Sequence, residues 1–129
     1  MSEPCSATDI ATRHHKLREL AEHTDPDDVQ AVLNLGAGVV LHGQLEPHCL
    51  QPVLQLVARE VRQELEAEHR RLDEDLELLA ELAESEPGGE DVALLAEALL
   101  ARLRNHLRRD ESTLYRPLAR ILAARSEDI

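Results

Sequence analysis

The stretch VVLHGQLEPHCLQPVL, residues 39–54, places polar side chains inside an apolar run at helical spacing. His42 and Glu46 are four residues apart, so a helix carries both on one face, among valines and leucines. Pro47 follows at once, although a proline inside a helix removes a hydrogen bond and crowds the preceding turn. A buried imidazole and carboxylate each need a partner, so the stretch predicts either a satisfied polar pair in a core or a ligand site.

The same three- and four-residue spacing recurs in three further segments, and each of the four apolar stripes contains one histidine. Turn-forming sequences separate the segments: HTDPDD at 23–28, where Asp25 is the expected N-cap before Pro26, and SEPGGED at 85–91. A weaker junction falls between 52 and 61. The pattern predicts helices over 7–23, 27–54, 58–85 and 91–124.

The composition favours helices packed on helices. Hydrophobic residues make up 43% of the chain and are mostly Leu and Ala, and Tyr115 is the one aromatic residue among Phe, Trp and Tyr. The 129 residues are enough for one domain with its own core, and we expect 1–129 to form that domain. We predict an all-α fold, an antiparallel up-down four-helix bundle.

The net charge and the short lengths of the apolar runs argue against several classes of partner. A net charge of −12 argues against nucleic acid and anionic membrane surfaces, because either favours a basic face. No apolar run approaches the ~18 residues that span a bilayer. The first ten residues, MSEPCSATDI, show no features of a secretory signal, and Cys5 and Cys49 are too few to indicate a disulfide framework. These features predict a cytoplasmic protein in a reducing compartment.

The four stripe histidines fall at one level of the predicted bundle. In antiparallel neighbours, residues equidistant from the connecting turn lie side by side. The midpoint of His14 and His42 is residue 28, at the end of the first turn, and the midpoint of His69 and His106 lies between 87 and 88, in the second. The midpoint of His42 and His69 lies between 55 and 56, at the weak junction. The numbering therefore predicts one layer of four imidazoles.

The ring nitrogens of such a buried layer need partners, because an unsatisfied buried polar group costs about 1–3 kcal/mol. A metal ion would satisfy the imidazoles, and two carboxylates accompany them: Glu46 four residues after His42, and Asp110 four residues after His106. Mixed nitrogen and oxygen ligands suit iron, manganese or zinc. Two carboxylates are also enough to bridge two ions.

Four segments resemble the two halves of a hemerythrin-like HHE cation-binding domain: RHHKLREL (13–20) with HGQLEPHCLQPVL (42–54), and EHRRLDEDLELL (68–79) with HLRRDESTLYRPL (106–118). The family pattern is a histidine on one helix and His-x-x-x-Glu with a Leu-x-Pro tail on the next, repeated twice. The resemblance implies a bundle that holds two non-haem iron ions in an Fe–O–Fe type centre, with zinc or manganese as alternatives. It also implies a small ligand: dioxygen, peroxide or nitric oxide.

Carried over by position, the resemblance implies metal ligation by His14, His42, Glu46, His69 and His106, with Asp110 or Glu111 as the last carboxylate. Asp110 matches when positions are counted forward from His106, and Glu111 matches when they are counted back from Pro117. Ligation by Glu111, five residues after His106, requires a local bulge in the helix, and we expect Glu111 to lie at least near the metal. His15 stays an alternative to His14.

Two residues bear on what the site does. Tyr115, four residues after Glu111, is a candidate hydrogen-bond donor beside the ligands. Asp73 stands where oxygen-carrying hemerythrins have a further histidine, which argues against simple oxygen carriage and favours peroxide or oxidase-type chemistry, or sensing.

The sequence leaves several functions open. They are a di-iron protein acting on oxygen species, an iron- or oxygen-sensing module without turnover, and a metal-free helical interaction protein. A ferritin-like bundle needs two Glu-x-x-His units, and only Glu66 with His69 fits that spacing. Neither enzymatic turnover nor an oligomeric state follows from the residues.

Overall fold

The computed structural model describes residues 6–127, and all regular elements in that range are helical, which confirms the all-α prediction. Four long helices make up the bundle: α1 (Ala7–His23), α2 (Val29–Cys49), α4 (Arg59–Ser85) and α5 (Glu90–Asp110). Three short elements complete it: α3 (Gln51–Leu54), a π-helix η1 (Glu111–Tyr115) and α6 (Arg116–Glu127).

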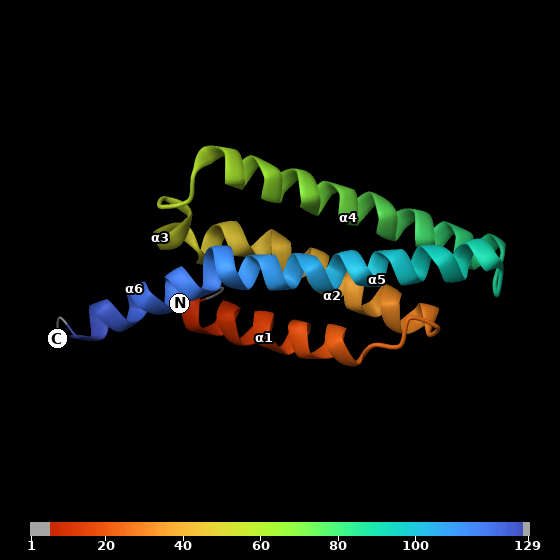
Figure 1. Cartoon of the computed structure of the whole chain (residues 1–129), viewed down its shortest axis with the longest axis horizontal. Coiled ribbons are helices and arrows are strands. Elements are labelled where there is room, and N and C mark those ends of the chain that lie inside the picture. The colour runs from red at the N-terminus through yellow and green to blue at the C-terminus, as the bar shows by residue number, and fades with distance from the viewer. Residues whose placement is uncertain (1–5, 128–129) are drawn as a thin grey trace, which may run out of the picture.

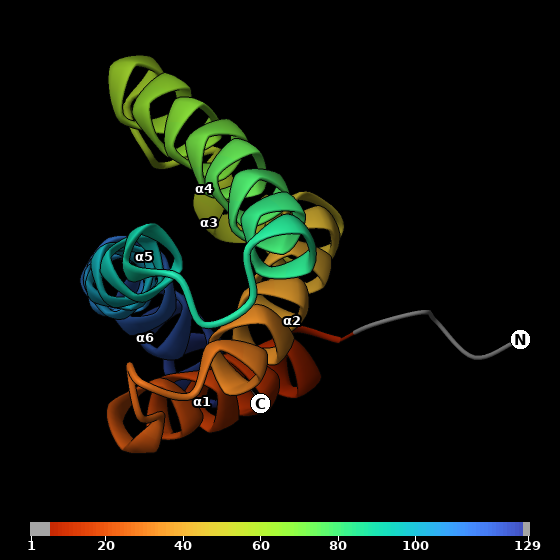
Figure 2. The ribbon, with the colours of Figure 1, turned by 90° about the vertical axis from the view of Figure 1, so that its right-hand side faces the viewer.

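The long helices form the predicted up-down bundle. Helices α1 and α4 lie on opposite sides of the α2–α5 pair, and each packs against both members of it (Figure 1; Figure 2). Helix α6 continues the line of α5 beyond the bundle through η1, and the short α3 packs against α6. The bundle therefore brings four inward-facing stripes together along one axis.

Side-chain caps decide where the first two helices begin. Ser6 caps α1 by accepting a hydrogen bond from the Asp9 amide at 3.1 Å. Asp28 caps α2 by accepting from the Ala31 amide at 3.0 Å. The prediction that Asp25 is this N-cap is wrong: its side chain accepts from the Asp27 amide at 2.9 Å, which stabilises the turn before the helix.

Two predicted helices are interrupted. The helix expected over 27–54 breaks at Leu50, three residues after Pro47, and resumes as α3. The helix expected over 91–124 changes to π geometry for five residues at Glu111–Tyr115 before α6. Between α4 and α5, Gly88 adopts a φ of 78°, a left-handed conformation that glycine tolerates best.

The interior consists of two apolar cores with polar residues between them. One core lies toward the α1–α2 and α4–α5 turns and includes Leu35, Leu79 and Leu103. The other lies toward α3 and α6 and includes Ile10, Leu50 and Leu118. On α1, α2 and α4 the stripe histidine lies between residues of the two cores. On α5, His106 lies near the end of the first core, next to Leu107, and the second core begins at Leu114 in η1, so the histidines lie at the boundary.

None of the helices within residues 6–127 is both long enough and apolar enough to cross a membrane. The expectation of reduced thiols does not hold for Cys49, which is buried and disulfide-bonded. Cys5 lies outside the described residues. The cysteines therefore give no support to a reducing compartment.

Close contact between α2 and α4 depends on Gly36. A Cβ atom at this position would lie 2.3 Å from Cδ1 and 2.8 Å from Cγ of Leu76, distances at which Leu76 has to move. A Cβ atom at Gly38, half a turn away, would meet only the end of the Leu17 side chain, at 3.1 Å.

We expect Gly36→Ala to be less stable than Gly38→Ala by about 1–3 kcal/mol, the usual cost of overpacking. Both changes gain about 1 kcal/mol in helix propensity, so the difference isolates the contact with Leu76. Urea unfolding of the two variants measures it. Equal stability would show that Leu76 repacks at no cost and that the α2–α4 distance does not require glycine.

Candidate metal centre

The four stripe histidines meet in two pairs at the boundary between the cores. Nδ1 of His14 lies 3.3 Å from Nε2 of His42, and Nε2 of His69 lies 3.0 Å from Nε2 of His106. His14, His42 and His106 are at most 4% exposed, whereas the side chain of His69 is 32% exposed. The layer that the sequence numbering predicted is present, and His69 forms its open edge.

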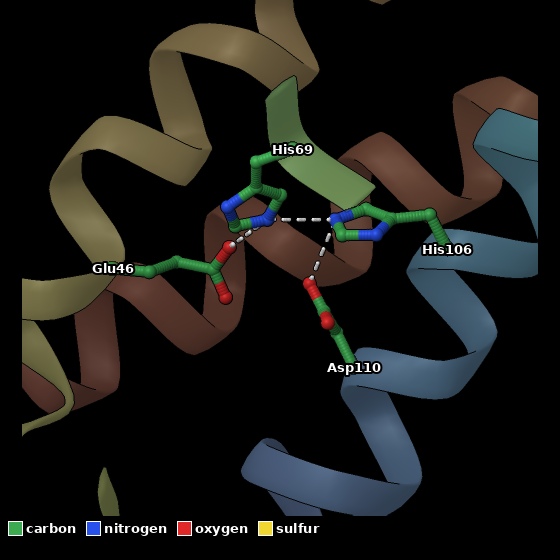
Figure 3. Close-up of side chains that lie close together, drawn as sticks. All are labelled: Glu46, His69, His106 and Asp110. Carbon is green, nitrogen blue, oxygen red and sulfur yellow. Dashed lines mark hydrogen bonds and ion pairs between the residues drawn. The ribbon is translucent and has the colours of Figure 1, made fainter. Parts of the chain in front are cut away.

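Two buried carboxylates lie beside these rings. Oε1 of Glu46 is 3.8 Å from Nε2 of His69, and Oδ2 of Asp110 is 3.2 Å from Nε2 of His106 (Figure 3). Figure 3 shows the carboxylates of Glu46 and Asp110 approaching the histidine pair from α2 and α5, Glu46 beside His69 and Asp110 beside His106. Both carboxylates are almost fully buried, at 4% and 1% exposed.

These side chains form two groups whose ligand atoms lie within 4.8 Å of one another. One group contains Glu46, His69, His106 and Asp110, and the other contains His14, His42 and Glu46. Glu46 belongs to both. The arrangement can therefore hold two neighbouring cations with one carboxylate between them.

Glu111 is absent from both groups. Asp110 is the last residue of α5 and keeps the four-residue spacing from His106, and the π geometry begins only after it. The Glu111 side chain points to α1, where its Oε1 lies 3.4 Å from Nε of Arg18. The bulge that Glu111 was expected to require exists, but the structure brings Asp110 to the histidines.

The π-helix instead places Tyr115 among the ligands. Its hydroxyl donates to Oε2 of Glu46 at 3.2 Å and lies 2.8 Å from Nε2 of His42. Its ring stacks on His14, with centroids 4.1 Å apart. The extra residue in η1 turns both Leu114 and Tyr115 into the interior. Tyr115 thus lies beside the candidate ligands, where the sequence placed it.

His15 and Asp73, by contrast, face solvent. The His15 side chain is 61% exposed and pairs with Glu19 on the same helix, so His14 is the histidine of α1 that faces the interior. Asp73, four residues after His69, is exposed and belongs to neither ligand group.

The structure also shows partners of the histidines that the sequence did not predict. Oε1 of Glu68 lies 2.8 Å from Nδ1 of His106, and Arg109 contacts the other Glu68 oxygen at 3.3 Å. His14 donates from Nε2 to the carbonyl of Leu107 at 2.9 Å. The sequence did not predict the Glu68 contact because Glu68 lies one residue off the apolar stripe, a position that periodicity assigns to solvent. It did not predict the Leu107 contact because a backbone carbonyl is not distinguished by residue type.

Several buried polar atoms in the two groups have no hydrogen-bond partner. They are Oε1 of Glu46, Nδ1 of His42 and both carboxylate oxygens of Asp110, although Asp110 Oδ2 is close to His106. Leaving carboxylate oxygens buried without donors is costly, and a cation removes that cost. The donor set and its unsatisfied atoms therefore fit metal ions.

Residues 7–118 match the family model of the hemerythrin HHE cation-binding domain. The chain belongs to this family. The match spans the four long helices and η1, so all six residues of the two ligand groups lie inside the HHE domain. No curated protein and no solved structure gave a significant match.

Burial and neighbouring charges set the protonation of the HHE site. Burial lowers the pKa values of His14 and His69, and burial together with the nearby His14 lowers the pKa of His42 to about 4. Burial and the nearby Asp110 raise the pKa of Glu46 to about 8.

His106 behaves differently from the other three histidines. Burial acts to lower its pKa, but the interactions with Asp110 and Glu68 outweigh burial and raise it to about 10. The metal-free layer at neutral pH thus contains one cationic imidazole beside the buried carboxyl groups, and three neutral imidazoles.

The HHE domain without metal should lose stability as the pH rises above neutral. The pKa values of Glu46 and His106 are raised on folding, from 4.5 to about 8 and from 6.5 to about 10, so the folded state retains protons that the unfolded chain releases. Their stabilisation is lost as the pH rises through the folded-state values. For Glu46 the loss is on the order of 2 kcal/mol between pH 6.5 and 8.

Thermal unfolding of chelator-treated protein at pH 6.5 and pH 9, followed by circular dichroism, measures this loss. Glu46→Gln removes one titrating group, so its melting temperature should fall less between the two pH values than that of the parent. Glu66→Gln, at an exposed position on α4, should keep the parental difference. The same fall in all three proteins would contradict the assigned protonation of Glu46.

Proposed function

We propose that this HHE domain binds two non-haem iron ions and uses them to bind or process dioxygen, peroxide or nitric oxide. The observation that carries the proposal is the shared position of Glu46 in both ligand groups. One ion would be held by His14, His42 and Glu46. The other would be held by His69, His106, Asp110 and the same Glu46, which would then bridge the pair.

Bound iron supplies the redox change and the coordination positions for a small ligand. The protein supplies the surroundings of those positions. Leucines of both cores, among them Leu107 and Leu114, exclude bulk water from the layer. Glu68 and the Leu107 carbonyl orient the rings of His106 and His14, and Tyr115 holds a hydroxyl hydrogen at Glu46.

A small ligand has a path to the layer at its open edge. A cavity of about 230 Å³ reaches Glu46 and His69 from the surface between α2 and α4. One helical turn after His69, outside this cavity, Asp73 faces solvent and contributes no ligand atom, so the His69 side has fewer nitrogen donors than an oxygen carrier of the family. This supports the processing of dioxygen or peroxide rather than reversible carriage alone.

Metal analysis of aerobically purified, iron-reconstituted protein tests the proposal. The parent should contain about two irons per chain, as a two-metal site requires, with near-ultraviolet charge-transfer absorption of ferric iron. His42→Ala and His106→Leu should each lose most of both signals. His15→Ala should keep them, because His15 is exposed on α1 and belongs to neither ligand group.

A parent protein that takes up no metal, and whose histidine variants are at least as stable as it is, would contradict the proposal and favour a metal-free helical scaffold. Stable uptake of zinc or manganese in preference to iron would overturn the choice of metal. Peroxide added to the iron form then tests whether the site consumes it, and dithionite tests whether the ferric absorption is lost on reduction.

Glu68 should affect metal affinity without contacting metal. Loss of a carboxylate that orients a ligating histidine typically lowers affinity about 10–100-fold. We expect Glu68→Ala to show this loss in a competition titration against a chelator, and Glu74→Ala, exposed on the same helix and away from the ligands, to bind as the parent does. Equal affinities for the two variants would show that the contact between Glu68 and His106 does not position the ring.

A further inference from the structure

A groove of about 470 Å³ lies between α1 and α2, outside the layer of ligands. Leu17, Leu20 and Leu41 give it apolar walls, and the last two are 53% and 60% exposed. Gly38 contributes no side chain to it, and a Cβ atom there would crowd Leu17 at 3.1 Å. The groove is in the size range of sites for small organic molecules.

Two cations line the same groove. Arg13 and Lys16, three residues apart on one face of α1, are both exposed. Neither makes an ion pair with a described residue at 4 Å or less. In a chain with a net charge of −12, a pair of cations beside an apolar wall selects a ligand with an anionic head and an apolar body.

His42 connects the groove with the metal centre. It lines the groove while being only 4% exposed, and its Nδ1 has no hydrogen-bond partner. Its Nε2 is engaged inside the bundle, near His14 and the hydroxyl of Tyr115. His42 therefore belongs both to the groove and to the metal centre, and its buried Nδ1 has no partner within the protein.

The proton on this ring can be assigned from its neighbours. A carbonyl only accepts, so Nε2 of His14 carries the hydrogen donated to Leu107, and Nδ1 of the neutral His14 ring is an acceptor. Nε2 of His42 then carries the hydrogen that faces it, and Nδ1 of His42 is unprotonated. A metal ion bound through Nε2 of His42 moves the ring hydrogen to Nδ1. Metal-bound histidines almost always donate this second N–H to a carboxylate, carbonyl or water.

We propose that the groove binds an organic monocarboxylate with an alkyl or aryl body, whose carboxylate pairs with Arg13 and Lys16 and accepts a hydrogen bond from Nδ1 of metal-bound His42. The leucine walls hold the apolar body. The last contact rests on the proposed function, since it requires metal at His42, whereas the contacts with the two cations and the leucines do not. Metal and carboxylate therefore strengthen each other's binding.

Calorimetric titration of octanoate into full-length protein tests the inference, with metal-free and zinc-loaded samples run side by side. We expect zinc-loaded protein to bind octanoate, and the metal-free protein to bind it about tenfold more weakly, the equivalent of one hydrogen bond to a charged group. Octan-1-ol lacks the charge and acetate lacks the body, so both should bind at least about tenfold more weakly than octanoate.

Matched charge reversals locate the site. Arg13→Glu with Lys16→Glu should weaken octanoate binding by about tenfold or more, because attraction becomes repulsion. Arg59→Glu with Arg120→Glu makes the same change in net charge at exposed positions away from the groove, and should bind as the parent does. Equal binding by the two double variants, or equal binding of octanol and octanoate, overturns the proposal.

Zinc content measured on the same samples separates the two proposals. If zinc loads at His42 and octanoate affinity is unchanged by it, the hydrogen bond from Nδ1 is wrong and the metal centre stands. If no metal loads, the proposed function fails, while a response of the metal-free protein to the Arg13 and Lys16 reversals still supports the carboxylate groove. Absence of octanoate binding in both samples overturns the groove.

Discussion

Burial of two carboxyl groups among four imidazoles is the constraint on which the rest of this bundle depends. Glu46 and Asp110 lie between two apolar cores, and Oε1 of Glu46 and Oδ1 of Asp110 have no hydrogen-bond donor. Such a layer is stable only when protons or cations neutralise it. The raised pKa of Glu46 shows the first solution and the paired ligand groups show the second. Metal binding by this family therefore answers a requirement that the fold itself creates.

The helices are shaped around that layer. The absence of a side chain at Gly36 lets α2 approach α4, and Gly43 leaves space in which a Cβ atom would already contact the His69 ring at 3.4 Å. The π-helix turns Tyr115 inward directly after Asp110 has completed the ligand set. Arg109 links Glu68 to Glu64 at the surface, which fixes the carboxylate that faces His106. Local departures from regular helix are concentrated at the site.

Periodicity predicted the bundle and the histidine layer well, because an apolar stripe and an equal distance from a turn are properties of the sequence numbering alone. It failed where alternatives are close in energy. Asp25 and Asp28 are both good N-caps, and only the turn geometry selects Asp28. Asp110 and Glu111 differ by one residue, and the point at which α5 changes to π geometry decides between them. Glu68 lies off the stripe, so its contact depends on the distance between α4 and α5.

The division of the interior into two cores also governs how the molecule opens. Each core packs mainly within itself, and the polar layer contributes little apolar contact between them. Without cations, we therefore expect the two ends of the bundle to be weakly coupled and to exchange amide hydrogens through separate local openings. Cations held by ligands from all four long helices, as proposed above, would couple these units, so that opening either end would require release of the ions. The bundle would then unfold as one cooperative body, and its slowest amides would report metal release rather than helix fraying.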